Sequence, residues 1–269
     1  MIKLCTIDLD GTLFDKNKNI SNENIEAIKK AKENGCKIVI CTGRPISGVK
    51  PVIEKLDLLS NEDYVVCYNG SKIINVGTNE VIFSKLIDGK TVKEIYHIAR
   101  KMNLYYHAFR DNEELITFKH NPYTDVEARI NNIEDHLIDF ETINDDEKFL
   151  KCMIVDEKEN LDEAMNTIPN ELYDKYSIVR SAGIFLEFLN KETNKGLALV
   201  ALAKYLNIDI SETMAIGDAG NDLDMIKFAG IGVAMENGYD YVKKAANYIT
   251  ASNEESGVAK ALNKFVNNC

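Results

Sequence analysis

The stretch CTIDLDGTLF, residues 5–14, places two carboxylates, Asp8 and Asp10, one residue apart at the end of an apolar run. Carboxylates this close repel each other, and an unpaired charge at the end of a buried strand is costly. Two explanations are open: the aspartates cap a turn, or a positive group lies between them. Parallel sheets bind ligands at the carboxyl ends of their strands, so the other strand ends decide between the two.

The sequence around this stretch predicts strands that alternate with helices. The first helix has Ser21 as its N-cap and Gly35 as its stop, and the alternation returns after Lys195. This pattern favours an α/β fold, a doubly wound, Rossmann-like parallel sheet with helices on both faces. In order, the elements expected first are strands and helices in turn, and then a hairpin: 2–8, 21–35, 37–43, 46–58, 64–70 and 71–83.

The middle of the chain has a different pattern. It predicts a helix and several strands that follow one another directly, as in an α+β unit with antiparallel strands. We therefore expect an α/β core over 1–84 and 190–269, interrupted by an inserted α+β cap domain over 85–189.

Composition excludes some classes of function. The net charge is −11, from 32 Lys and Arg against 43 Asp and Glu, and no basic stripe is present, so a nucleic-acid partner is not expected. No apolar stretch of membrane-spanning length and no signal peptide is recognised, which favours a cytoplasmic protein without a membrane partner. No pattern indicates an oligomeric state. Six cysteines without a C-x-x-C pair favour reduced core residues over disulfides or a zinc site: Cys5, Cys36, Cys41, Cys67, Cys152 and Cys269.

The two opening acids suit phosphoryl chemistry. Asp8 can act as a nucleophile towards phosphorus and form an aspartyl-phosphate. Asp10 can act as general acid to the leaving oxygen and then as base to water. Leu9 points to the opposite side of the strand, into the core.

Two further motifs offer positive or donor groups at strand ends. Thr42-Gly43-Arg44 supplies a hydroxyl and backbone N–H groups that can cradle a phosphate, although Arg44 can equally form a salt bridge at the start of a helix. Lys195 begins a helix where the core resumes and could neutralise phosphate oxygens. The alternative for Lys195 is an ordinary solvated charge.

A fourth motif, AIGDAGNDLDM at 215–225, follows a predicted strand. Short-spaced acids at a strand end, opposite two more acids, favour a site for Mg²⁺, with Asp218 as the main ligand. The alternative is an acidic helix N-terminus stabilised by the helix dipole, which fits Asp224 and Asp222 better than Asp218.

Together these motifs resemble those of the haloacid dehalogenase-like phosphatases, and more narrowly of the Cof/YidA-type sugar-phosphate phosphatases. The long insert after the second motif resembles the type IIB arrangement, in which an α/β lid follows that motif. Eight stretches carry the likeness: DLDGT (8–12), TGR (42–44), YNGS (68–71), FLKCMIVDE (149–157), SAGIFLEFLNKETNKG (181–196), KG (195–196), GDAGND (217–222) and SNEESGVAKAL (252–262).

The resemblance implies roles for single residues. Asp8 would be the nucleophile and a Mg²⁺ ligand, Asp10 the acid and base with its backbone carbonyl on the metal, and Asp218 the remaining carboxylate ligand. Asp222 would position Lys195 or a metal-bound water, and Asn69 and Arg44 are possible substrate contacts. The phosphate-binding groups would be the backbone N–H of Leu9 with Thr42, Gly43, Lys195 and Asn221.

These expectations describe a Mg²⁺-dependent phosphatase of small phosphomonoesters, sugar phosphates above all. Two alternatives stay open: a phosphomutase on the same core, and a non-catalytic phosphate-binding protein, which the presence of both Asp8 and Asp10 disfavours. Cap residues that could select the substrate by their polarity are His107, Arg110, Tyr123 and Arg180. The alternative for each is an ordinary half-exposed residue of a strand or helix.

Overall fold

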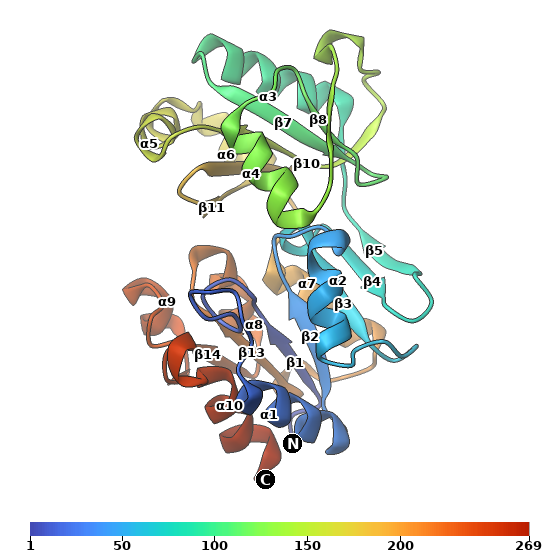
Figure 1. Cartoon of the computed structure of the whole chain (residues 1–269), viewed down its shortest axis with the longest axis vertical. Coiled ribbons are helices and arrows are strands. Elements are labelled where there is room, and N and C mark those ends of the chain that lie inside the picture. The colour runs from blue at the N-terminus through green and yellow to red at the C-terminus, as the bar shows by residue number, and fades with distance from the viewer. Residues whose placement is uncertain (269) are drawn as a thin grey trace. The chain divides into compact units, whose positions relative to one another are not determined.

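The computed structural model describes residues 1–268, so the predicted end of the core at Cys269 lies outside the described residues. The chain forms two compact units (Figure 1). Unit 1 comprises Met1–Gly43, Lys50–Phe83 and the chain from Asn194 onward, and unit 2 comprises Arg44–Val49 and Ser84–Thr193.

Unit 1 is built on a mostly parallel sheet. Within residues 1–268 this sheet has eight strands in the order β15-β14-β13-β1-β2-β3-β4-β5. The pairs from β15 through β3 are parallel, and β4 pairs antiparallel with β3. The predicted α/β fold with a parallel sheet is therefore confirmed. The strands are β1 (Leu4–Ile7), β2 (Lys37–Cys41), β3 (Tyr64–Cys67), β4 (Lys72–Asn75), β5 (Val81–Ser84), β13 (Thr213–Gly217), β14 (Ile231–Ala234) and β15 (Tyr248–Ile249).

Helices cover both faces of this sheet because its strands are apolar on both sides. Leu4, Val39 and Ala215 pack against α7 and α8 on one face. On the other side α1 and α10 lie next to each other, and the Asn24 side chain accepts the Ala259 N–H at 2.8 Å. The helices are α1 (Asn22–Glu33), α2 (Ile46–Lys55), α7 (Lys195–Tyr205), α8 (Leu223–Phe228), α9 (Asp240–Ala245) and α10 (Gly257–Leu262).

Local sequence explains where these helices begin and end. The Ser21 hydroxyl accepts the Asn24 N–H at 3.2 Å, as expected of an N-cap, and Gly35 follows α1 with a φ of +84°. The segment NDLDMIKFAG, residues 221–230, predicts a helix, but the helix that forms there is shorter. A 3₁₀ turn (Gly220–Asp222) comes first, and only then α8.

Unit 2 contains an antiparallel sheet with one parallel pair. Its strands run in the order β11-β12-β10-β7-β8-β9, with β6 paired to the end of β10, and β8 and β9 are the parallel pair. The α+β character expected of the middle of the chain is present. The elements are β6 (Ile87–Asp88), α3 (Gly89–Lys101), β7 (Tyr105–Arg110), β8 (Leu115–Thr117), α4 (Pro122–Asn131), β9 (Asp135–Leu137), β10 (Lys148–Val155), α5 (Lys158–Thr167), α6 (Asn170–Lys175), β11 (Tyr176–Ala182) and β12 (Phe185–Asn190).

The two faces of the unit 2 sheet differ in chemistry. Tyr106 on β7 and Ile154 on β10 belong to an apolar cluster that α3, α5 and α6 complete. The alternating residues His107 and Lys151 point to the opposite face, where they meet side chains of α4. One sheet therefore has an apolar face and a face with buried polar and charged groups.

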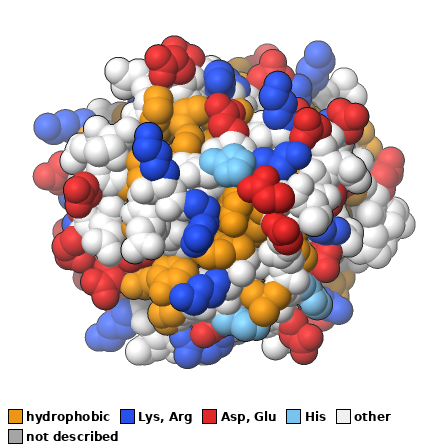
Figure 2. Space-filling view, turned by 90° about the horizontal axis from the view of Figure 1, so that it is seen from above, with side chains coloured by type: hydrophobic (Ala, Val, Ile, Leu, Met, Phe, Trp, Pro, Cys, Tyr) orange, Lys and Arg blue, Asp and Glu red, His pale blue; other side chains and the backbone are white. Residues whose placement is uncertain are grey.

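The surface, the helix lengths and the cysteines show the features expected from the composition. Seen from above in Figure 2, acidic, basic and apolar side chains are interspersed over the visible face. Among residues 1–268, no helix combines the length and apolarity needed to cross a membrane. The described cysteines are buried thiols outside any disulfide: Cys5, Cys36, Cys41, Cys67 and Cys152.

Candidate active site

Three loops of the expected site follow neighbouring parallel strands of unit 1. β1 lies between β2 and β13 and pairs in parallel with both. Asp8 follows β1, Thr42 follows β2 and Asp218 follows β13. Because the carboxyl ends of parallel strands meet at one edge, the register alone brings these loops together.

Lys195 lies between two carboxylates at this edge. Its Nζ is 2.5 Å from Asp8 Oδ1 and 2.6 Å from Asp222 Oδ1. The lysine and Asp222 are fully buried, and Asp8 is 5% exposed. Lys195 is therefore not a solvated charge.

Asp218 is held on the other side of this cluster by the opening motif. Its Oδ1 accepts a hydrogen bond from the Thr12 hydroxyl at 2.8 Å. A Cβ on Gly11 would lie 2.5 Å from Asp218 Oδ2, and Gly11 has a φ of +89°, so only glycine fits there. The sequence alone assigned no role to Thr12, although Thr12 belongs to the DLDGT motif.

Asp222 organises the turn that carries Asp218. Its Oδ2 accepts the backbone N–H groups of Asp218 and Ala219 at 2.9 and 3.0 Å. Its Oδ1 contacts Lys195, so one carboxylate joins the turn to the lysine. An acid that only stabilises a helix N-terminus would not need this second contact.

The charges of this cluster favour binding of a cation. One carboxylate oxygen from each of Asp8, Asp218 and Asp222 can be chosen so that all lie within 4.8 Å of one another, while one ammonium faces them. Burial and the nearby Asp222 raise the pKa of Asp8 well above its usual range, although Lys195 counteracts them. Burial and Asp222 also raise the pKa of Asp218 to about 6.

Lys195 itself stays charged. Burial alone would lower its pKa, but the attraction of Asp222 and Asp8 outweighs burial and raises it. When all three acids are ionised, the single ammonium leaves two negative charges in excess, which a divalent cation would neutralise. Hard carboxylate oxygens are the donors that Mg²⁺ prefers, so this donor set fits such an ion.

Asn69 links the second motif to the fourth. Its backbone N–H donates to the Thr42 carbonyl at 2.9 Å, and its Oδ1 accepts from Asn221 Nδ2 at 3.0 Å. A Cβ on Gly43 would lie 3.0 Å from the Asn69 side chain. Asn69 is 1% exposed with a φ of +53°, so it fixes the relative positions of Thr42, Gly43 and Asn221.

The YNGS stretch also touches the start of the lysine helix. Gly70 has a φ of +101°, and a Cβ there would lie 2.4 Å from the Asn194 carbonyl oxygen. The Asn194 side chain caps α7 by accepting the Leu197 N–H at 2.7 Å. Lys195 is thus placed by a capped helix start that packs on a tight glycine turn.

The Asp10 side chain has a lysine partner of its own. Its Oδ1 is 2.5 Å from Lys18 Nζ, and its side chain is 40% exposed, whereas Leu9 between the two acids is fully buried as expected. The group of three acids that could hold a metal contains Asp222 in place of the Asp10 side chain. Each opening aspartate thus contacts a different lysine, Asp8 contacting Lys195 and Asp10 contacting Lys18.

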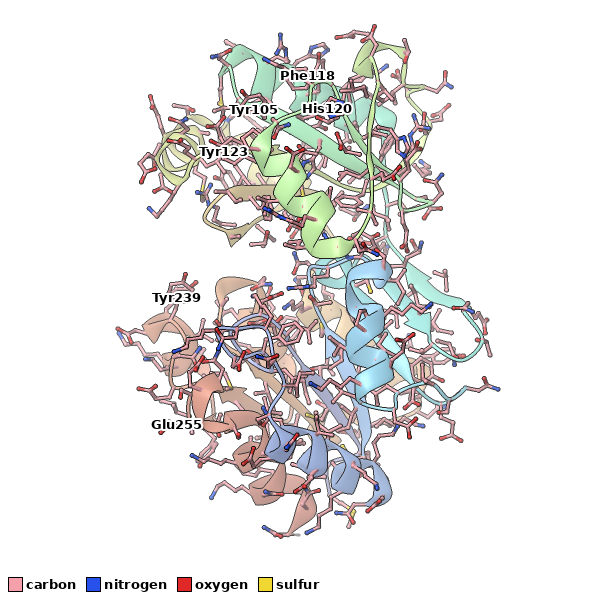
Figure 3. The ribbon with its side chains drawn as sticks, in the orientation of Figure 1. Tyr105, Phe118, His120, Tyr123, Tyr239 and Glu255 are labelled. Carbon is pink, nitrogen blue, oxygen red and sulfur yellow. The ribbon has the colours of Figure 1, made fainter. Side chains whose placement is uncertain are left out.

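The remaining expected contacts fall in unit 2. Arg44 belongs to this unit. Burial raises the pKa of Glu127, and the positive charge of Arg44 counteracts part of this rise. His107 is fully buried, with Nδ1 2.9 Å from the Thr124 hydroxyl. Figure 3 shows Tyr123 near Tyr105, and their ring centroids are 5.8 Å apart.

Two arginines named from polarity have structural partners. Arg110 Nε lies 3.4 Å from Glu114 and 3.3 Å from Glu147. Arg180 donates to the backbone carbonyls of Lys158 and Gly183. Both arginines therefore stabilise turns and strand ends within unit 2.

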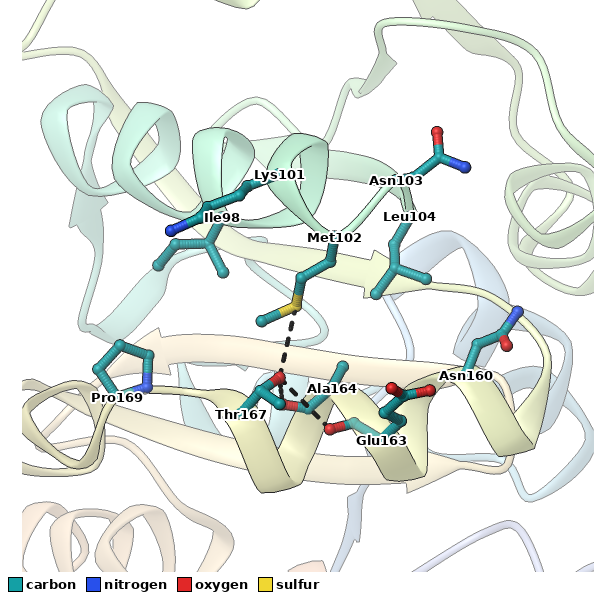
Figure 4. A pocket seen from close by; sticks show the side chains of 10 residues that line it. All are labelled: Ile98, Lys101, Met102, Asn103, Leu104, Asn160, Glu163, Ala164, Thr167 and Pro169. Atoms are coloured by element: carbon teal, nitrogen blue, oxygen red, sulfur yellow. Dashed lines mark hydrogen bonds between the residues drawn. The ribbon is translucent and has the colours of Figure 1, made fainter.

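A pocket of about 570 Å³ opens between α3 and α5 of unit 2 (Figure 4). Met102 and Thr167 face each other across it, with Sδ and Oγ1 4.0 Å apart. Lys101 and Glu163 are the charged residues of its lining, and none of the expected site residues belongs to it.

Comparison with known proteins agrees with this geometry. The profile of the haloacid dehalogenase-like hydrolases matches residues 5–262, which is nearly the whole chain. The chain belongs to this family. YxeH of Bacillus subtilis (strain 168) is 39% identical to it over 268 residues, covering 99% of each chain.

Further proteins similar to this haloacid dehalogenase-like hydrolase include a named phosphatase and two solved structures. The 5-amino-6-(5-phospho-D-ribitylamino)uracil phosphatase YcsE of Bacillus subtilis (strain 168) is 33% identical over 267 residues, covering 98% of this chain and 96% of YcsE. Among solved structures, a haloacid dehalogenase-like hydrolase from Bacteroides thetaiotaomicron has a TM-score of 0.86 at 35% identity, with 98% and 99% of the chains covered. The subclass IIB sugar phosphatase BT4131 has a TM-score of 0.82 at 27% identity, with 98% of each covered. The protein is a phosphatase of this family.

Proposed function

We propose that this phosphatase is Mg²⁺-dependent and hydrolyses small phosphomonoesters, sugar phosphates in particular, through an aspartyl-phosphate on Asp8. The observation that carries the proposal is the position of Lys195, whose Nζ lies 2.5 Å from Asp8 and 2.6 Å from Asp222. A buried ammonium against the first acid of the pair can hold a phosphoryl oxygen beside the nucleophile.

The reaction would proceed in two displacements. In the first, a carboxylate oxygen of Asp8 forms a bond to phosphorus while the bond from phosphorus to the leaving oxygen breaks, and Asp10 gives that oxygen a proton. In the second, water attacks the aspartyl-phosphate and gives its proton to Asp10, which frees Asp8 and inorganic phosphate. Both acids return to their starting states.

The carboxylates of Asp8 and Asp218 and the backbone carbonyl of Asp10 would hold Mg²⁺. When bound, the ion supplies positive charge that neutralises carboxylates and phosphate oxygens in a buried site. Asp222 keeps Lys195 and the Asp218 turn in place, as its hydrogen bonds to both support.

The phosphate oxygens would meet donors from several loops. Their proximity is supported by the hydrogen bonds of Asn69, which connect the second and fourth motifs. This buried asparagine orients the donors, and its amide and Arg44 are the substrate contacts that we propose beyond the phosphate. The donors are the Leu9 N–H, Thr42, Gly43, Lys195 and Asn221.

The proposed substrate class has support from the relatives. YcsE is named for a phosphoribityl compound, and BT4131 is titled a sugar phosphatase, so both names point to a phosphate on a polyhydroxylated carbon chain. We propose that unit 2 acts as the substrate lid and selects the organic part of the ester. The five described cysteines are thiols outside any disulfide, which supports a location in the reducing cytoplasm.

Replacement of the nucleophile tests the proposal. Asp8→Asn should abolish release of inorganic phosphate from p-nitrophenyl phosphate and from a panel of sugar phosphates, nucleotides and pyridoxal phosphate. Asp57→Asn is the matched control, because Asp57 is exposed with a φ of +53°, a conformation that asparagine tolerates. Turnover by Asp8→Asn at a near-normal rate would disprove the mechanism.

Two further measurements complete the test. Activity with and without added Mg²⁺ examines the cofactor. Free phosphate measured against isomerised sugar phosphate separates hydrolysis from the mutase alternative, because a mutase would convert the ester and release little phosphate.

A further inference from the structure

The turn after the opening motif aims a lysine at Asp10. Lys18 Nζ lies 2.5 Å from Asp10 Oδ1, and an isolated β-bridge between Asp10 and Phe14 brings the start of the turn next to Asp10. Lys18 Nζ is also 6.0 Å from the centroid of the Phe14 ring. Asp10 belongs to the first sequence motif, but Lys18 lies outside all four motifs.

The backbone of this turn is fixed in a conformation that lysine seldom adopts. Lys18 has a φ of +62°, in the left-handed region that favours glycine or asparagine. Asp15 closes the turn: its Oδ1 accepts the N–H groups of Asn17 and Asn19 at 2.8 and 2.7 Å, and its carbonyl accepts the Lys18 N–H at 3.0 Å. Left-handed non-glycine residues held by their surroundings concentrate at functional sites.

The turn is also anchored to a distant part of unit 1. Asn253 Nδ2 donates to the Phe14 carbonyl at 2.8 Å, and the Lys16 N–H donates to Glu254 at 2.7 Å. These contacts hold the backbone at the start of the turn, at Phe14 and Lys16. The backbone position from which Lys18 extends is therefore set by the fold and not by Lys18 alone.

Stability does not explain the pair. The side chains of Lys18 and Asp10 are 58% and 40% exposed. Ion pairs with this exposure contribute about 0–1 kcal/mol to folding. A strained backbone that presents a weakly stabilising lysine to the acid of the reaction calls for another explanation.

We propose that Lys18 is a positioning residue for Asp10, an inference that rests on the proposed function. Lys18 holds one carboxyl oxygen of Asp10 and so directs the second oxygen towards the leaving group. The proton then passes from that second oxygen to the leaving oxygen as the bond to phosphorus breaks. Lys18 itself exchanges no proton and touches no substrate atom.

Leaving-group dependence tests this role. An alkoxide leaves poorly without a proton, whereas p-nitrophenolate leaves well without one. The ratio of kcat/KM for glycerol phosphate to kcat/KM for p-nitrophenyl phosphate therefore reports protonation of the leaving group. Hydrolysis of the aspartyl-phosphate does not affect this ratio, because kcat/KM covers only the steps up to formation of that intermediate. Lys18→Met should lower this ratio roughly tenfold or more, as part of the 10²–10⁴-fold that general acid catalysis supplies.

Controls separate positioning from damage. Lys18→Arg should keep the ratio near that of the unaltered protein, and Lys16→Met, which removes a charge from an exposed lysine of the same turn, should leave it unchanged. In an Asp10→Asn background, Lys18→Met should change the ratio no further, because it acts through Asp10.

Each outcome is decisive. An unchanged ratio in Lys18→Met, or an equal loss of kcat/KM on both esters, overturns the positioning role while leaving the phosphatase proposal intact. If the unaltered protein hydrolyses neither these esters nor any ester of the sugar-phosphate panel, the proposed function fails and this inference fails with it.

Discussion

Two buried lysines in this protein each lie between two carboxylates, one in each unit. In unit 1, Lys195 Nζ is 2.5 and 2.6 Å from its acids, and in unit 2, Lys151 Nζ is 3.4 and 3.3 Å from Glu127 and Glu187. All of these side chains are at least nine-tenths buried. Burial and charge pairing are therefore shared features and do not by themselves distinguish a reactive site from a structural one.

The difference lies in where the lysines stand in the fold. Lys151 is in the middle of β10, on one face of a sheet, with Glu127 on α4 and Glu187 on β12. Lys195 begins a helix at the carboxyl edge of a parallel sheet, and a further acid, Asp218, stands beside its partners. In the Lys151 cluster two acids face one ammonium, and the positive charge of Arg44 also acts on Glu127. In the Lys195 cluster three acids face one ammonium, so only this cluster calls for a divalent cation. Position and charge imbalance, more than burial, indicate chemistry.

The largest expected effect separates the two lysines by activity. Lys195→Met should lower kcat/KM for p-nitrophenyl phosphate by about 10²–10³-fold or more, because a buried charge that stabilises the transferred phosphoryl group is lost. Lys204→Met, an exposed lysine in the last turn of the same helix, is the control and should retain activity. Retained activity in Lys195→Met would remove the functional distinction between the clusters.

The second prediction concerns stability. Lys151→Met should destabilise the protein by about 3–5 kcal/mol in urea unfolding, because two buried carboxylates lose their shared partner. Combining it with Glu127→Leu and Glu187→Leu should recover at least half of that loss, since an apolar cluster replaces buried charge. If the triple variant is no more stable than the single one, Lys151 does more than neutralise its two acids.

The third prediction uses the charge imbalance. Mg²⁺ at about 100 times its dissociation constant should stabilise the protein by about 2.7 kcal/mol, which corresponds to a rise of several degrees in Tm. Asp218→Asn should remove the rise, whereas Glu187→Gln in the other cluster should leave it. An equal loss in both variants would mean that the ion does not bind specifically to the cluster of Asp8, Asp218 and Asp222.

The smallest effect concerns the neighbour of the unit 2 lysine. Burial, with a smaller contribution from Lys151, lowers the pKa of His107 from 6.5 to about 3. Between these values the unfolded chain binds a proton that the folded chain does not, so the free energy of unfolding should fall by about 1.4 kcal/mol per pH unit below pH 6.5. His107→Gln should flatten this slope.

Urea unfolding at pH 7.5 and 5.5 measures the His107 effect. His136→Gln, which changes an exposed histidine of the same unit, serves as the control and should keep the slope. A slope that persists unchanged in His107→Gln would assign the acid sensitivity of unit 2 to other groups.

Much of the site could be predicted because its residues sit in local motifs. Asp8, Thr42, Lys195 and Asp218 were each placed at a strand end or helix start from pattern alone, and the register of β1 with β2 and β13 brings their loops to one edge. What pattern could not supply is the pairing between loops. The hydrogen bond of Thr12 to Asp218 and the contact of Lys18 with Asp10 join residues whose spacing carries no periodic signal.

The sequence by itself determined the alternation of elements, the order of the motifs and the ends of strands at which they stand. These follow from side-chain periodicity and capping, which act over a few residues. Tertiary structure alone decided that Asn69 joins the second motif to the fourth and that Gly70 packs on the carbonyl before Lys195. Such contacts depend on close packing between segments far apart in the chain, and packing has no local signature.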